Sequence, residues 1–316
     1  MIGKWMIDCL LANVDCKIIV AGRSEEKFRQ RFAENPNLSF LQWDPSHPTP
    51  LTTNNQPPIT HLDFIIHLAS NTHPVAYATD PVSTIVTNVS ATKELLDLAV
   101  EKKSRFVYAS SVEIYGQNRG DCEKFKEDYC GYIDCNTLRA GYPESKRCGE
   151  ALCQAYIKQY GLDVVITRIA RVYGPTLLKD DTKALSQFIH NAQEGKDIVL
   201  KSEGKQHFSY LHVADAVSGI LTVMLNGEKG GAYNIADEKS DITLRDLAGL
   251  IAGQCGRKVV FDIPDTAEKS GFSPAMLARM DSGLLRSLGW EAAYDIQSGI
   301  AETIEMMKIS RGALCL

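Results

Sequence analysis

The sequence predicts an α/β protein with an open, doubly wound parallel sheet and a smaller, mostly helical C-terminal lobe. Short β-prone runs alternate with helical segments over the first half of the chain, and helical periodicity dominates after residue 236. The β-prone runs cover residues 17–21, 38–44, 62–70, 105–109 and 162–168. The chain has 316 residues, 44% of them hydrophobic, which is enough to bury such a core.

The N-terminal segment departs from this plan. Residues 2–11 predict a helix and residues 17–21 a strand, as in a Rossmann-like dinucleotide-binding unit after its glycine-rich loop. Gly3 then matches the third glycine of that loop, and neither the first strand nor the loop precedes it. An internal start codon or missing residues before Met1 explain this better than true loss, because a sheet without its central strand leaves buried backbone groups unpaired. If the loop is truly absent, we expect weak cofactor binding.

The end of the second predicted strand bears on the choice of cofactor. Ala21, Gly22 and Arg23 stand where an NAD enzyme usually has an acidic residue for the ribose hydroxyls. An arginine there can accept a 2'-phosphate, so NADP is an alternative to NAD. Arg23 can equally be an exposed residue at the start of the helix predicted for residues 25–32. A proline-rich segment at residues 45–58 predicts a loop.

A central stretch contains the candidate catalytic residues. The strand at residues 105–109 ends in Ser110 and Ser111. Tyr142 and Lys146 lie four residues apart at the start of a helix, which places them on adjacent turns of one side. A neighbouring ammonium favours the phenolate, so we expect Tyr142 to take a proton from an alcohol held by Ser111 while a nicotinamide takes the hydride. A Tyr-x-x-x-Lys pair alone would more often be a solvated helix face.

The chain resembles the extended short-chain dehydrogenase/reductase family of nucleotide-sugar epimerases and dehydratases over nearly its whole length. Ser111, Tyr142 and Lys146 match the family's catalytic trio. The run from Leu68 to Asn88 is most similar to the UDP-glucuronate decarboxylases of that family. The matching positions in this run are Pro74, Tyr77, Pro81, Thr84 and Asn88.

The resemblance implies a cofactor site at the carboxyl ends of the predicted strands. Leu68, Ala69 and Ser70 would lie against the cofactor, Asp44 near its adenine, and Tyr173 in a turn over its nicotinamide. The full implied set is Gly3, Arg23, Asp44, Leu68, Ala69, Ser70, Asn88, Tyr142, Lys146 and Tyr173.

Three positions bear on the reaction. The resemblance implies that Glu113 is a fourth catalytic residue, since a glutamate there occurs in dehydratases and decarboxylases and can move a proton near sugar carbons 5 and 6. Dehydratases usually add an aspartate where this chain has Val112, so decarboxylation fits better. Arg139 matches an arginine of the decarboxylases and can neutralise a substrate carboxylate. Each charge can also be a solvated loop residue.

The substrate region departs from the family. Thr176 and Phe208 stand where arginines commonly hold the nucleotide diphosphate, and Lys183 or another lysine nearby would have to compensate as a point charge. The implied substrate contacts are Arg139, Thr176, Lys183 and Phe208. We expect a dinucleotide-binding domain at residues 1–174, to which residues 206–235 return. The substrate lobe would then comprise residues 175–205 and 236–316.

The expected function is therefore an NAD-dependent conversion of a nucleotide sugar through a 4-keto intermediate, most similar to UDP-glucuronate decarboxylation. The alternatives are a 4,6-dehydratase or 4-epimerase, an NADPH-dependent carbonyl reductase, and a binding protein that lacks the cofactor. The predicted helix from Thr84 to Ala99 has an apolar face that is either buried in the monomer or forms a homodimer contact with the Tyr142 helix.

Composition limits the other possibilities. The net charge of -5 and the absence of a basic stripe argue against nucleic acid as a partner, and no apolar run is long enough for a membrane span. Without a signal-peptide pattern we expect a cytoplasmic protein. Nine scattered cysteines without a Cys-x-x-Cys pair indicate reduced thiols, and the histidines show no metal-ligand spacing.

Overall fold

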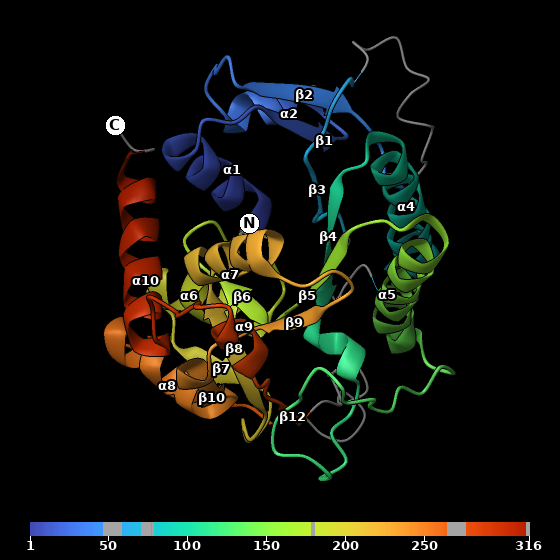
Figure 1. The fold of residues 1–316 in the computed structure, drawn as a ribbon. Helices are drawn as coiled ribbons and strands as arrows, with labels where there is room; N and C mark the ends of the chain where they lie inside the picture. Colours follow the sequence, from blue (N-terminus) through green and yellow to red (C-terminus); the bar gives the residue numbers. More distant parts are fainter. Residues whose placement is uncertain (47–58, 71–76, 78, 178–180, 264–275, 314–316) are drawn as a thin grey trace.

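The computed structural model describes residues 1–46, 59–70, 77, 79–177, 181–263 and 276–313 (Figure 1). Helices and parallel strands alternate along the first part of this chain, so the predicted α/β class is confirmed. Most of the loop predicted at residues 45–58 lies outside the described residues.

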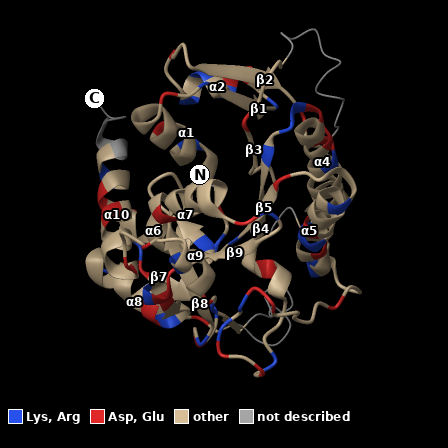
Figure 2. Cartoon of the chain, in the orientation of Figure 1, with Lys and Arg blue, Asp and Glu red and all other residues tan. Residues whose placement is uncertain are grey.

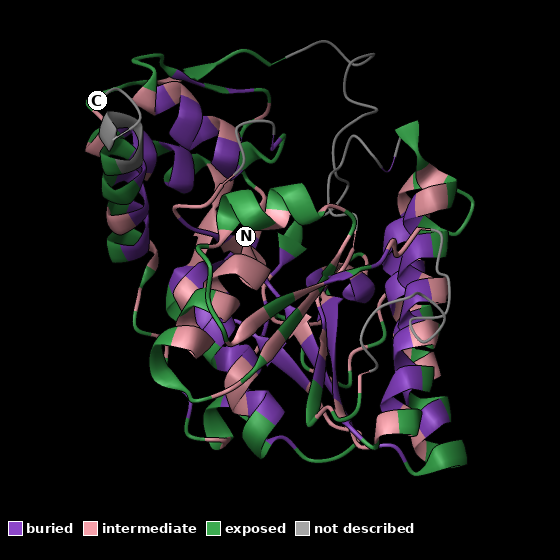
Figure 3. Ribbon diagram, turned by 90° about the horizontal axis from the view of Figure 1, so that it is seen from above, coloured by how far each residue is buried: buried purple, intermediate pink, exposed green. Residues whose placement is uncertain are grey.

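The main sheet has the strand order β3–β4–β5–β9, with every neighbouring pair parallel. Helices α4 and α5 cover one face and α7 covers the other, which confirms the doubly wound arrangement (Figure 1 and Figure 3). β4 and β5 are buried along most of their length because both of their faces are covered. The bounds are β3 (Phe64–His67), β4 (Arg105–Ser111), β5 (Val164–Ile169), β9 (Ala232–Ile235), α4 (Pro81–Lys102), α5 (Gly141–Tyr160) and α7 (Val213–Asn226).

The sheet is interrupted next to β3, as the sequence indicates. β1 (Ile18–Gly22) and β2 (Leu38–Gln42) pair in parallel with each other, and in the described ranges neither pairs with β3. α1 (Ile2–Asn13) packs on α7, while α2 (Glu25–Arg31) packs on β2 (Figure 1). The described strands therefore form two separate parallel ladders here, β1–β2 and β3–β4–β5–β9.

The C-terminal lobe combines helices with short strands. β10 and β12 pair with β8, which lies with β6 in the part predicted to belong to the dinucleotide-binding domain, and β7 pairs with β11. The predicted lobe therefore holds more β-structure than expected. The predicted cap of α8 is confirmed, because the Thr243 hydroxyl accepts the N–H of Asp246 at 3.1 Å. The strands are β6 (Arg171–Tyr173), β7 (Ile198–Leu200), β8 (His207–His212), β10 (Asp241–Thr243), β11 (Val259–Phe261) and β12 (Leu277–Ala278). The helices are α6 (Ala184–Gln193), α8 (Leu244–Gln254), α9 (Gly283–Ser287) and α10 (Ile296–Ala313).

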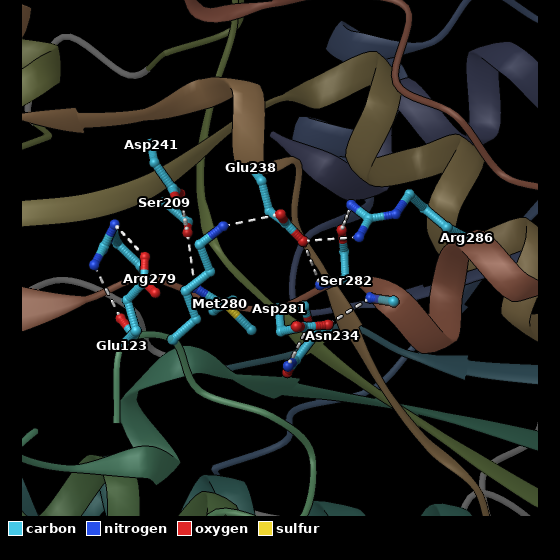
Figure 4. A network of polar contacts seen from close by, with 12 residues as sticks. Glu123, Ser209, Asn234, Glu238, Asp241, Arg279, Met280, Asp281, Ser282 and Arg286 are labelled. Carbon is cyan, nitrogen blue, oxygen red and sulfur yellow. Dashed lines mark hydrogen bonds and ion pairs between the residues drawn. The ribbon is translucent and has the colours of Figure 1, made fainter. Parts of the chain in front are cut away.

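A polar network fastens this lobe to the main sheet (Figure 4). The Asn234 side chain at the end of β9 donates to the backbone carbonyls of Phe125 and Asp281 at 2.9 and 2.8 Å. The Ser209 hydroxyl on β8 accepts the Met280 N–H at 2.9 Å. Because β9 belongs to the main sheet and β8 to the separate sheet with β6, β10 and β12, the loop after β12 is held by both sheets. The domain boundaries proposed at residues 174, 205 and 235 stay a prediction.

Charged residues are distributed without a single-sign face. Figure 2 shows acidic and basic residues interspersed over the helices of both parts. No helix in the described ranges is both long enough and apolar enough to cross a bilayer.

The apolar face of α4 is buried in the monomer. Leu95, Leu96 and Ala99 lie in the core between α4, α5 and β4. For these three residues the prediction of burial within the monomer therefore holds (Figure 3). Val82 and Ile85, earlier in α4, stay exposed, and the homodimer contact therefore remains a prediction. The close packing of α5 on β4 depends on Gly149, where the Tyr108 ring meets the helix backbone.

We predict that Gly149→Ala destabilises the fold. A Cβ at this position would lie 2.0 Å from the Tyr108 hydroxyl oxygen, and the fully buried Tyr108 ring has no room to retreat. The free energy of unfolding should fall by about 1–3 kcal/mol in urea denaturation. The control is Gly249→Ala in α8, where no atom lies within 4 Å and helix propensity should add about 0.5–1 kcal/mol. Equal effects of the two substitutions would contradict the packing argument.

Candidate active site

Two serine hydroxyls stand at the carboxyl edge of the main sheet. β3 and β4 are parallel neighbours, so the residues that follow them lie at the same edge. β4 ends at Ser111, whose hydroxyl accepts the N–H of Glu113 at 3.2 Å and so starts a 3-10 turn. β3 runs into Leu68, Ala69 and Ser70, all of them half-buried. The sequence prediction that a hydroxyl lies at this strand end agrees with the fold.

Tyr142 lies at the start of α5 and points its phenol at this edge. Burial raises the pKa of Tyr142 to about 12, against the opposing effect of its hydrogen bonds to Ser111 and Ser70. Glu113 is close enough to raise this pKa further. The Tyr142 phenol therefore lies close to the predicted Ser111 and Glu113. It is protonated at neutral pH in this structure.

Lys146 lies one turn further along α5 and is 2% exposed. Its ammonium donates to the Ala109 carbonyl of β4 at 2.8 Å and lies over the Tyr108 ring. Burial lowers the pKa of Lys146 to about 8, with nearby Glu150 opposing the shift. The expectation that Lys146 lowers the Tyr142 pKa needs correction: the ammonium is directed to β4, and burial of the phenol outweighs the hydrogen bonds that favour its ionised form.

A buried amide connects the site to α4. Asn88 is fully buried, and its carbonyl oxygen accepts the Ser70 hydroxyl at 2.7 Å. Its amide nitrogen donates to the Ser145 hydroxyl at 2.9 Å, and Ser145 donates to the Tyr142 carbonyl at 2.7 Å. Asn88 was expected to contact the cofactor; here both ends of its side chain are used to hold Ser70 and α5 in place.

Glu113 lies between two guanidinium groups beside the trio. Its two carboxylate oxygens are 3.5 Å from an Arg139 nitrogen and 3.6 Å from an Arg171 nitrogen. Arg139 also lies over the ring of Tyr77, and that ring stacks on Tyr142 with 4.9 Å between centroids. The predicted Glu113 and Arg139 are therefore brought together with Tyr142.

The sequence reasoning assigned no role to Arg171 or Tyr77. Arg171 lies on β6 with its guanidinium 3.7 Å from the centroid of the Phe208 ring, so the predicted Phe208 also borders the site. An arginine inside the apolar run from Ile169 to Val172 was the available signal, because a buried strand rarely carries an unpaired charge. Tyr77 is predicted only as a position that matches the UDP-glucuronate decarboxylases. Pro74, another of these positions, lies outside the described residues.

Three of the implied cofactor contacts lie toward the N-terminal ladder. Gly3 is in the first turn of α1, where an added Cβ would meet no atom nearer than the Leu68 side chain at 3.9 Å. Arg23 is exposed after β1, and its carbonyl accepts from Gln42 at 2.7 Å. The Asp44 carboxylate accepts from the backbone and hydroxyl of Ser46 at 3.0 and 2.6 Å.

The last group of predicted contacts lies toward the lobe. Tyr173 is 1% exposed and its ring edge packs on His212, so it is a core residue in this structure. The hydroxyls of Tyr173 and Thr176 are buried and have no hydrogen-bond partner among the described residues. Lys183 is exposed at the N-terminus of α6. None of these three is brought into contact with the trio by a described interaction.

A surface cavity of about 600 Å³ lies away from these residues. Its lining includes Cys122, Lys126, Tyr129 and Asp281 and none of the predicted site residues. We expect the active site at the trio, because a strand-end hydroxyl, a buried phenol and a buried ammonium lie close to the end of β4 among the described residues. The described residues contain no group of His, Cys, Asp and Glu side chains suited to a metal ion.

A serine at a strand end, with a buried Tyr and Lys one turn apart on the next helix of a doubly wound sheet, defines the extended short-chain dehydrogenase/reductase class. The chain belongs to the NAD-dependent epimerase/dehydratase family, whose family model matches residues 1–236. It is therefore an enzyme of this family.

Similar proteins include both decarboxylases and enzymes of known structure. UDP-glucuronic acid decarboxylase 6 of Arabidopsis thaliana is 28% identical over 98% of this chain and 87% of its own length. A dTDP-glucose 4,6-dehydratase from Streptomyces venezuelae, solved with NAD, is 25% identical with a TM-score of 0.81 over 99% of this chain and 95% of that one. UDP-glucose 4-epimerase from Thermotoga maritima, at 19% identity and a TM-score of 0.82 over 98% and 96% of the two chains, shares the fold.

The residues present fit the nicotinamide end of NAD. Ser70, Ser111, Tyr142 and Lys146 offer hydroxyl and ammonium donors at one edge of the sheet. On the other side of this edge the first turn of α1 brings Gly3 next to Leu68, which leaves backbone N–H groups near the place where a pyrophosphate binds in this fold. These residues would hold the cofactor.

We predict a specific pH dependence for Lys146→Met. Folding lowers the pKa of Lys146 from 10.5 to about 8, so between these values the unfolded chain binds more protons and the wild-type fold gains stability as pH rises. At about 1.4 kcal/mol per pH unit, the stability of wild type relative to the variant should rise by roughly 3 kcal/mol over this window. Guanidinium denaturation at several pH values measures it.

The matched control for this measurement is Lys93→Met on α4. Asp97 raises the pKa of Lys93, so this group titrates above the window. The stability difference between wild type and the control variant should stay constant from pH 8 to 10.5. A flat profile for Lys146→Met as well would show that its ammonium is not desolvated.

Proposed function

We propose that this enzyme converts a nucleotide sugar through a 4-keto intermediate, and that the reaction is decarboxylation of a UDP-glucuronate-type substrate. The observation that carries the proposal is the position of Glu113 between Arg139 and Arg171, next to Tyr142. Guanidinium groups suit a sugar carboxylate, and the trio suits the sugar's 4-hydroxyl. The similarity to UDP-glucuronic acid decarboxylase 6 supports the same substrate class.

The first step is removal of two hydrogens from carbon 4. Bound NAD supplies the acceptor for the hydride and returns it at the end of the cycle. Ser111 would hold the 4-hydroxyl beside Tyr142, and Tyr142, after losing its phenolic proton to solvent, would take the hydroxyl proton as the hydride leaves. The Ser111 hydroxyl would stabilise the phenolate by hydrogen bonding. Lys146, held by the Ala109 carbonyl, would offer its remaining ammonium hydrogens to the cofactor.

The ketone at carbon 4 then activates the carboxylate on carbon 5. The bond between carbon 5 and the carboxyl carbon breaks, carbon dioxide leaves, and the electron pair forms an enolate. Arg139 holds the carboxylate before it leaves, and Glu113, after taking up a proton from solvent, is positioned to deliver it to carbon 5. Return of the hydride to carbon 4 and of the proton from Tyr142 completes the cycle without net redox change.

Val112 favours decarboxylation over dehydration. A 4,6-dehydratase needs an acid for the departing hydroxyl, whereas Val112 is apolar and only 4% exposed. A second candidate function, NADPH-dependent carbonyl reduction, is favoured by Arg23, whose exposed side chain makes no described ion pair that would keep it from a 2'-phosphate. Net consumption of NADPH would distinguish it from the internal redox cycle.

We predict that the enzyme releases carbon dioxide from UDP-glucuronate in the presence of NAD and forms a pentose nucleotide. Tyr142→Phe should lower this rate by about 10²–10⁴-fold with the fold intact, because the base is lost. Tyr160→Phe, at the exposed end of the same helix, is the control and should leave the rate unchanged. Near-normal turnover of Tyr142→Phe would exclude Tyr142 as the base.

We predict that Glu113→Gln slows the step after oxidation. The substrate should still be oxidised at carbon 4, because Tyr142 remains. Protonation of the enolate at carbon 5 should become slow. Reduced nicotinamide should therefore accumulate transiently in stopped-flow absorbance measurements. The control is Glu123→Gln, an exposed carboxylate 3.6 Å from Arg279. A product rate equal to wild type would remove the reason to prefer decarboxylation.

A further inference from the structure

Arg171 is held in a fixed orientation at the border of the active site. β6 pairs in parallel with β8, which places Arg171 opposite Tyr210 and next to Phe208. The guanidinium lies 3.7 Å from the Phe208 ring centroid, and one of its nitrogens is 3.6 Å from Glu113. Stacking on an aromatic ring keeps the planar N–H fork pointed in a defined direction.

The charges around Glu113 are not balanced. Two guanidinium groups, of Arg139 and Arg171, face one carboxylate, and both separations, 3.5 and 3.6 Å, are too long for strong hydrogen bonds. The second terminal nitrogen of Arg171 is buried and has no hydrogen-bond partner among the described residues. A buried donor without an acceptor costs free energy, and an incoming anion can relieve that cost.

We propose that Arg171 binds an oxyanion of the substrate. The oxyanion is a carboxylate or a phosphate oxygen, and the identity of the whole substrate rests on the proposed function. Position 208, where the family resemblance leads us to expect an arginine, holds the phenylalanine on which the Arg171 guanidinium lies. Arg171 of β6 therefore places a guanidinium next to the position where the expected arginine of β8 is replaced by Phe208.

A purely structural role for Arg171 makes a different prediction. If Arg171 only neutralised Glu113, its replacement would change stability but would affect neutral and anionic ligands alike. If it binds an oxyanion, the loss of affinity follows the ligand's anionic group. The measurement is therefore the Kd of chosen ligands by calorimetry in the presence of NADH, which cannot accept a hydride and so prevents turnover.

The experiment compares wild type with Arg171→Gln and Arg171→Lys. The probes are UDP-glucose, UDP-glucuronate, pyrophosphate and glucuronate. Arg171→Gln should weaken binding by at least about tenfold, and Arg171→Lys by less, because lysine keeps the charge without the fork. The control is Arg119→Gln: this arginine stacks on Tyr132 at 4.1 Å, outside the site, and its loss should change no Kd.

The probes separate the two sources of the oxyanion. If Arg171 binds the sugar carboxylate, only UDP-glucuronate and glucuronate lose affinity. If it binds the diphosphate, both nucleotide sugars and pyrophosphate lose affinity. Unchanged Kd values of Arg171→Gln for every probe would overturn the inference, as would a wild type that binds none of them.

Failure of the proposed function would look different. Wild type would then bind neither nucleotide sugar, and the inference would be decided by pyrophosphate and glucuronate alone. If Arg171→Gln does not fold, as judged by its thermal unfolding, Arg171→Lys decides in its place, and wild-type affinity of that variant would overturn the inference.

Discussion

The site depends on one buried charge. The Lys146 ammonium, almost without solvent contact, donates a hydrogen bond to the Ala109 carbonyl. This contact joins α5 to the C-terminal part of strand β4. Desolvating an ammonium is costly, and a single carbonyl compensates it only in part. The desolvation of Lys146 therefore destabilises the fold next to Tyr142 and Ser111. Such a loss of stability at a reactive group is typical of enzymes.

The elements around this charge are connected so that they hold one geometry. Asn88 joins the end of β3 to α4 and α5 through two hydrogen bonds, and both ends of its amide are satisfied. A half-satisfied amide in this position would destabilise the core, whereas a complete network fixes the direction of each hydroxyl. The position of Ser70 near the Tyr142 phenol is thus fixed by its hydrogen bond to Asn88 of α4.

The sequence was sufficient for features that depend on local spacing. The meeting of Ser111 with Tyr142 follows from a strand end and a helix start, and both patterns are visible along the chain. Arg171 on Phe208 follows instead from pairing between β6 and β8, which no local pattern specifies. The pKa of Tyr142 was predicted in the wrong direction for a related reason: spacing places the lysine nearby, but only packing decides how far burial raises the pKa and where the ammonium points.

The interruption between β3 and the β1–β2 ladder has a consequence for how the molecule unfolds. Since no backbone ladder joins the two in the described ranges, side-chain packing such as that of Trp43 against Ile65 and Leu95 connects β1, β2 and α2 to the main sheet. Such a segment behaves as its own cooperative unit and opens at a lower free energy than the core. Amide hydrogen exchange would then divide the chain into two populations, and one melting temperature would describe neither.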